Sequence, residues 1–367
     1  MTCLDSGQVR TGTADLPLHG GRAPRWLFER MTLLAREIGL AVLTEEGSPG
    51  LLRRLADPVW FQAFGCVLGF DWHSSGVTTT VCGALKEGLR DVSGSGLVVA
   101  GGKGRASRRT PQEIESACEL SGQEAAPLVR ASRLAAKVDS AAVQDGFQVY
   151  HHTFLFSADG AWAVVQQGMN EGTGMARRYH WLTPPRFDSE PHAAVAGRPG
   201  PEVLNLVALE GEGNRRLSAT LAREQPELVL GDLRKMRSLT MPRHHEVRLS
   251  DLDPSRLGRI LLHAYEAQPA DFTDLLAVPG VGAKALRALS LVAELAYGEP
   301  ASLRDPVSFS FAHGGKDGTP FPVDRQTYDA TVESLHRAVS EARLGRNDKV
   351  EALRRLARLP AGAGTSG

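Results

Sequence analysis

The chain lacks the features that mark secreted, membrane-spanning and cysteine-based zinc proteins. Its four cysteines, Cys3, Cys66, Cys82 and Cys118, are scattered without any Cys-x-x-Cys spacing, which argues against a disulfide framework or a Cys-rich zinc site. No apolar run approaches the ~18 residues that a bilayer-spanning helix needs, and the N-terminus has no apolar signal-peptide core. We therefore expect a cytoplasmic protein with no membrane partner.

Net charge is also lacking. Lys and Arg number 42 and so do Asp and Glu, which gives a formal charge of +0. This balance excludes a protein that attracts nucleic acid by its overall charge, so any nucleic-acid surface must be a local patch. At 367 residues the chain is long enough for two or three domains, and it shows no internal repeat.

The most informative stretch runs from Leu275 to Leu289 and reads LLAVPGVGAKALRAL. Apolar residues at helical spacing flank a Pro-Gly-Val-Gly turn, which is typical of a helix-hairpin-helix element. The N-terminus of the second helix is partly positive and offers free N–H groups, which suits a phosphate oxygen. We expect Gly280, Val281, Gly282 and Lys284 to contact a nucleic-acid backbone, most readily that of DNA. The alternative is a plain turn between helices, since Gly ends helices and Pro begins them.

The pattern of the whole chain predicts an α+β fold with two domains. Residues 1–245 form a mixed α/β domain, in which 147–167 make an antiparallel hairpin around the turn at Asp159-Gly160. Residues 246–360 form an all-α domain with the helix-hairpin-helix at 271–298, where Gly298 ends the second helix. The small-residue tail 361–367 is expected to be disordered.

A basic glycine-rich loop follows the buried strand expected at 97–100. The segment GGKGRASRR at 101–109 contains Lys103, Arg105, Arg108 and Arg109. Its positive side chains and glycine N–H groups are suited to holding phosphates, whereas its spacing does not match a Walker A loop. The alternative is a flexible basic surface loop without a ligand.

Ionisable side chains are dense in the N-terminal part, at Asp71, His73, His151 and His180. They are candidates for acid/base catalysis, and Asp71, His73 and His151 for ligands of a divalent metal, Mg²⁺ or Mn²⁺. His151 and the adjacent His152 should point to opposite faces of a strand, so at most one of them enters a given site. The alternative is that these are half-buried, hydrogen-bonded histidines, and a metal nuclease usually has more carboxylates.

The hairpin region resembles DNA glycosylases of the endonuclease III type, which have a lysine two residues after the last hairpin glycine and an aspartate in a Val-Asp context. Lys284 and Asp324 occupy the matching places, and the resemblance implies that they act in base excision. However, Asp324 follows Lys284 by 40 positions, a longer gap than in that family. The cysteine cluster is absent, so no Fe-S cluster is expected. Alternatively, Lys284 contacts phosphate and Asp324 caps a helix.

Nearly the whole chain resembles the DUF763 family of bacterial and archaeal proteins. The segments that match are 11–21, 64–76, 101–104, 150–153, 165–170 and 312–318. The resemblance implies that residues from about 10 to 345 act as one unit, and it implies no activity, because the family is one of unknown function.

Together these observations predict a DNA-binding enzyme of DNA repair or processing that could also contact other repair proteins. Strand cleavage by a nuclease is favoured, since the long gap to Asp324 departs from the glycosylase pattern. A glycosylase/AP lyase using Lys284 and Asp324, a non-catalytic DNA-binding adaptor and an RNA-processing protein remain alternatives.

Overall fold

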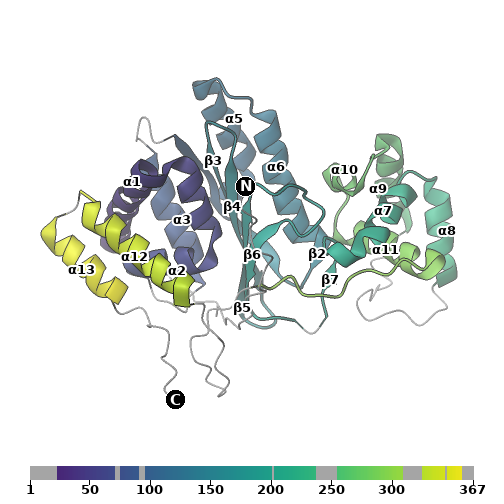
Figure 1. Cartoon of the computed structure of the whole chain (residues 1–367). Coiled ribbons are helices and arrows are strands. Elements are labelled where there is room, and N and C mark those ends of the chain that lie inside the picture. Colours follow the sequence, from purple (N-terminus) through teal and green to yellow (C-terminus); the bar gives the residue numbers. More distant parts are fainter. Residues whose placement is uncertain are drawn as a thin grey trace, which may run out of the picture.

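The computed structural model is a mixed α+β protein built around a five-stranded antiparallel sheet (Figure 1). The structure describes residues 23–70, 75–90, 96–200, 202–236, 254–308, 325–343 and 345–357. The sheet has the order β1-β3-β4-β5-β6, with β1 Leu97–Lys103, β3 Gln148–Ser157, β4 Trp162–Asn170, β5 Met175–Leu182 and β6 His192–Ala196. The α+β class predicted from the sequence is therefore present.

The β3–β4 hairpin lies at the centre of the sheet. Its turn contains Gly160 at φ 85°, and Ser157 N donates to Ala161 O across 3.0 Å. A positive φ is favourable only for glycine and a few small polar residues, so the Asp-Gly signal fixes this turn. The antiparallel hairpin predicted for residues 147–167 is confirmed.

One face of the sheet is covered by a helical layer that includes the C-terminal helices (Figure 1). The helices of this layer are α1 Arg25–Ala56, α2 Pro58–Leu68, α3 Gly76–Leu89, α12 Arg325–Glu341 and α13 Arg346–Ala357. Leu155 and Val165 from the sheet share one apolar core with these helices.

The opposite face is covered by α5 Thr110–Ser121, α6 Ala126–Lys137 and the π-helix η1 Val138–Ala142. Phe154, Trp162 and Trp181 point from the sheet into this second core. The same core continues into the remaining elements: β2 Val143–Gln144, β7 Leu204–Asn205, η2 Leu209–Gly211, α7 Glu212–Leu221, α8 Pro226–Met236, α9 Pro254–Ala267, α10 Phe272–Ala277 and α11 Ala283–Tyr297.

The segments after residue 245 pack in two different places. Helices α9, α10 and α11 pack with α7, α8 and α6, whereas α12 and α13 pack on α1 and α2. Gln144 Nε2 donates to Ala283 O at 2.9 Å, and Arg130 pairs with Asp274 at 2.9 Å. Contacts thus cross the boundary expected near residue 245, and the division into two domains stays a prediction. The tail expected at 361–367 lies outside the described residues.

Within the described ranges, no helix has the length and apolar character needed to cross a lipid bilayer.

Candidate nucleic-acid interface

The basic loop, residues 101–109, joins β1 to α5 through the single helical turn α4 Arg105–Arg108. Gly101, Gly102 and Gly104 have φ of 90°, 137° and 60°. A Cβ on Gly101 would lie 2.3 Å from His152 O and 2.5 Å from Thr110 Oγ1. Only glycine readily adopts these positive φ values and also leaves the space that a Cβ at position 101 would fill. The glycines therefore let the loop turn tightly against β3.

The positive side chains of the basic loop are exposed and not neutralised. Among the residues that the structure describes, no carboxylate pairs with Lys103, Arg105, Arg108 or Arg109. Lys103 Nζ instead lies 5.7 Å from the centre of the Tyr150 ring. Other arginines of the chain do have acidic partners, such as those pairing with Glu46, Asp274 and Glu190. Although the chain as a whole has no net charge, the basic loop therefore forms a local positive patch.

A cavity of about 320 Å³, here called the loop pocket, opens between α3 and the basic loop. It is lined by Thr79, Cys82, Gly83, Lys86, Glu87, Arg90, Gly101, Gly102, Lys103, Ala106, Arg109, Glu113 and Thr153. Lys86 Nζ donates to Glu113 at 2.5 Å and to Gly101 O at 2.7 Å, and Gly101 N donates to the same carboxylate at 2.8 Å. This bonding ties α3, β1 and α5 together around the pocket.

The inner wall of the loop pocket is formed by Thr153 and Cys82, both buried. His151 Nε2 lies 2.9 Å from Thr153 Oγ1, and Lys103 is the register partner of His151 across β1 and β3. Burial is the main cause that lowers the pKa of His151 from 6.5 to about 3, and the positive charge of Lys103 acts in the same direction. Burial raises the pKa of the Cys82 thiol to about 12. His151 is therefore neutral, and Cys82 is a protonated thiol rather than a nucleophile.

His180 shares the sheet face of His151 but is fully engaged in the core. Its Nδ1 donates to Leu55 O at 2.9 Å, and its Nε2 accepts from Arg178 Nε at 2.8 Å. Burial, with the charge of Arg178, lowers the pKa of His180 well below 6.5. Arg178 also donates to Gln62 and Thr78. Because both ring nitrogens are used, this arrangement favours a packing role for His180 over contact with a substrate.

His152 points to the opposite face of the sheet, as the alternation of a strand predicts. It bonds Ser132 Oγ and Gln166 Oε1, each at 2.9 Å, and Gln166 in turn contacts the buried Asp139. Asp139 also accepts from Trp181 Nε1 at 3.0 Å and pairs with His192 at 2.5 Å. This network is enclosed in the second core and provides hydrogen bonds there.

Three residues expected to be catalytic, Asp71, His73 and Asp324, lie outside the described residues. Over the part of the chain that is described, no group of three or more His, Cys, Asp or Glu side chains could hold a metal ion. Of the three ligands expected from the sequence, the structure places only His151. The divalent metal stays a prediction.

The predicted hairpin is a short turn between α10 and α11. Gly280 is exposed at φ 86°, Val281 is buried, and Gly282 precedes the first turn of α11 in an extended conformation. Lys284 is exposed in that first turn. The helix stop is confirmed, since Gly298 adopts φ 74° at the C-terminus of α11. Binding of DNA by this turn stays a prediction.

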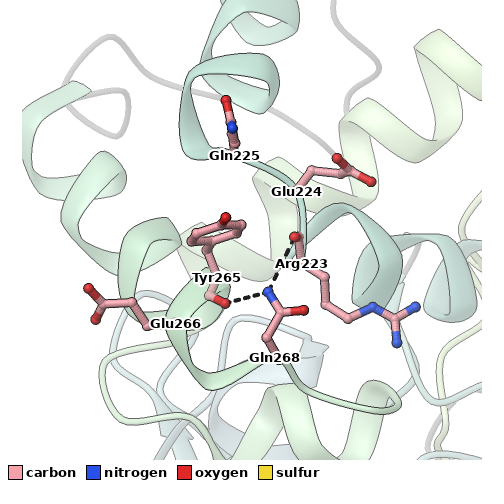
Figure 2. A pocket seen from close by; sticks show the side chains of 6 residues that line it. All are labelled: Arg223, Glu224, Gln225, Tyr265, Glu266 and Gln268. Carbon is pink, nitrogen blue, oxygen red and sulfur yellow. Dashed lines mark hydrogen bonds between the residues drawn. The ribbon is translucent and has the colours of Figure 1, made fainter.

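A larger cavity of about 590 Å³ lies between the α7–α8 connection and the end of α9 (Figure 2). Arg223 donates to the carbonyls of Pro269 and Ala270, and Gln268 Nε2 donates to Tyr265 O at 2.6 Å. Glu224 and Glu266 also line it. Two carboxylates and a bonded arginine suit a phosphate poorly, and none of the predicted site residues lies there.

Lys86, Glu113 and Thr153 were not among the residues that the sequence singled out. The sequence could have indicated Thr153, because residues two apart on a strand share a face. Thr153 therefore lies on the same face of β3 as His151. No local signal pairs Lys86 with Glu113, which are 27 positions apart.

The chain belongs to the family described as Protein of unknown function (DUF763), whose model matches residues 12–323. No curated protein and no solved structure matches it.

Proposed function

We propose that this protein is a DNA-binding enzyme of DNA processing that holds the DNA backbone with its basic loop. The observation that supports this is the set of cations at Lys103, Arg105, Arg108 and Arg109, none of which pairs with a carboxylate among the residues that the structure describes. In a chain with a formal charge of +0, four exposed cations without carboxylate partners concentrate positive potential at one place. Such a patch binds phosphates and releases their counterions.

The hairpin before α11 is proposed as a second backbone contact. Gly104 N donates to Tyr150 O at 2.8 Å, and Ala283 O accepts from Gln144 at 2.9 Å. The chain from residue 144 to 150 spans at most about 22 Å when extended. Loop and hairpin therefore lie within roughly one turn of duplex, about 34 Å, of each other. This distance is compatible with one DNA segment that passes around the edge of the sheet, from the α3 side where the loop pocket opens to the α6 side where the hairpin packs.

Strand cleavage is the activity that we propose, with His151 beside the loop pocket and with Asp71 and His73 as its partners. The glycosylase alternative has less support, because an activated lysine is usually desolvated in a pocket and Lys284 is exposed. A DNA-binding adaptor and an RNA-processing protein remain alternatives that the same experiment distinguishes.

The test of binding compares two matched double variants. Arg105→Glu/Arg108→Glu should weaken DNA binding and lower the slope of log K against log salt by about 1.8, since each phosphate contact contributes about 0.9. The control, Arg216→Glu/Arg346→Glu, reverses two exposed arginines outside the loop and should keep the slope. Fluorescence anisotropy at several salt concentrations measures both. If the loop variant has the same salt slope as the wild type, the loop does not contact the DNA.

Activity is tested on labelled duplex, single-stranded, uracil-containing and abasic DNA and on RNA, with and without Mg²⁺ or Mn²⁺. We expect metal-dependent cuts in DNA that are lost in Asp71→Asn or His73→Ala. Breaks seen only after alkali would support the glycosylase, binding without breaks the adaptor, and cuts confined to RNA the RNA-processing protein.

A further inference from the structure

We propose that the loop pocket binds a terminal phosphate monoester of DNA, so that the protein recognises phosphorylated strand ends. This inference rests on the proposed function and names the part of the DNA that the pocket receives. It is supported by the charge, the size and the donors of the pocket.

The charge of the pocket fits a dianion. Lys86, Arg90, Lys103 and Arg109 line it together with Glu87 and Glu113. Lys86 pairs with Glu113 and Arg90 with Glu87, which leaves Lys103 and Arg109 without a carboxylate partner in the described part of the chain. A phosphate monoester has a charge of about −1.5 to −2 at neutral pH, whereas a backbone diester has one negative charge per phosphate. Two unneutralised cations therefore match a monoester better than an internal phosphate.

The size of the pocket suits the end of a strand. Its volume of about 320 Å³ is at the lower end of the ~300–1,000 Å³ range of small-molecule sites. A phosphate with part of one nucleotide fits such a volume, whereas a duplex passing through would need an open groove. The exposed Arg105 and Arg108 of the same loop remain available for the phosphates that follow.

The inner wall of the pocket offers a buried hydroxyl as a further donor. Thr153 is 1% exposed and its Oγ1 is 2.9 Å from His151 Nε2. His151 Nδ1 is buried and has no hydrogen-bond partner among the described residues. A buried N–H without a partner is rarer than an unused acceptor, which favours the tautomer with the proton on Nε2. His151 then donates to Thr153, and the Thr153 hydroxyl proton can point either to the neighbouring Cys82 sulfur or to a phosphate oxygen in the pocket.

The experiment measures binding of the full chain to identical short duplexes that carry a 5′-phosphate, a 3′-phosphate or only hydroxyl ends. We expect at least about tenfold tighter binding to one phosphorylated end. The nearly isosteric Thr153→Val should reduce this ratio several-fold while binding to the hydroxyl duplex changes little. Lys103→Gln should reduce the ratio and also weaken binding to the hydroxyl duplex, because Lys103 belongs to the basic loop. The exposed Arg216→Gln should keep the ratio.

A second arm uses a nucleoside 5′-monophosphate alone and follows the melting temperature. An upward shift that Lys103→Gln abolishes supports a phosphate-binding site in the loop pocket. If the same protein binds no DNA, the proposed function is wrong although the loop pocket binds the phosphate. The inference is wrong if DNA binds with equal affinity whatever its ends and the monophosphate gives no shift in melting temperature. The proposed function is unaffected by that result. A nucleoside without phosphate should give no shift, and an equal shift with it also overturns the inference.

Discussion

At the scale of single residues, the histidines of the central strands are neutral because they are buried. Burial lowers the pKa of His151 to about 3 and also lowers the pKa of His152 and His180. Each of them makes a hydrogen bond within the sheet or to a neighbouring helix. Their role in the fold therefore depends on their remaining uncharged, which gives folding a dependence on pH.

Stability should fall as pH falls below about 6.5. The unfolded chain protonates histidine near pH 6.5, whereas folded His151 stays neutral down to about pH 3. The unfolded state thus binds more protons in this window and is favoured by acid. At pH 5 the effect of His151 alone is about 2 kcal/mol, at 1.36 kcal/mol per pH unit.

Urea unfolding at pH 7 and pH 5 measures this effect. His151→Gln should lose about 2 kcal/mol less than the wild type between the two pH values, because glutamine does not titrate. The exposed His336→Gln should show the wild-type loss. An equal loss in all three proteins would show that His151 is protonated in the folded state.

At the scale of elements, β3 shows what the sequence could and could not predict. The alternation of the strand correctly placed His151 and His152 on opposite faces, and the Asp159-Gly160 signal correctly placed the turn. The loop pocket was not predictable, because it depends on Lys86 of α3 meeting Glu113 of α5 and Gly101 of β1. Local pattern determines turns and faces, but the partners of a side chain depend on tertiary packing.

Substitutions at the two glycines of the turn before α11 can distinguish a role in DNA binding from a role in the backbone conformation. Gly282 has φ −135°, and an added Cβ would have only Gly280 O near it, at 4.0 Å. Gly282→Ala should therefore fold, at a cost of less than about 1 kcal/mol. Its methyl group should obstruct the N–H groups that precede α11. If they bind phosphate, DNA affinity should fall about tenfold, close to the loss of one charge-assisted hydrogen bond.

Gly280→Ala provides the comparison, because alanine at φ 86° strains the backbone by about 1–3 kcal/mol. Chemical denaturation reports the strain and anisotropy reports the DNA affinity. If Gly282→Ala binds DNA as the wild type does, the turn only connects two helices.

At the scale of the whole molecule, the last two helices complete a layer that begins with the first. The match to the family ends at residue 323, yet α12 and α13 pack on α1 and α2. Arg355 Nε donates to Val67 O at 2.8 Å, and Leu335 and Leu356 belong to the core between this layer and the sheet. The sequence predicts an all-α segment over residues 246–360 but not where its last helices pack, since nothing local indicates a partner some 300 positions away.

Leu335→Ala should therefore destabilise the whole protein rather than loosen only its C-terminus. Leu335 is 0% exposed, and Leu→Ala substitutions in a core cost about 2–5 kcal/mol because a cavity remains. Val350 on α13 is 39% exposed, so Val350→Ala should change stability by less than about 0.5 kcal/mol.

Urea unfolding followed by circular dichroism measures the stability of both variants. A single transition shifted to lower urea in Leu335→Ala is expected, because the cavity opens in the core that α12 shares with α1, α2 and the sheet. An early separate loss of helical signal, followed by a transition at the wild-type midpoint, would show instead that α12 and α13 unfold independently of the layer that they cover.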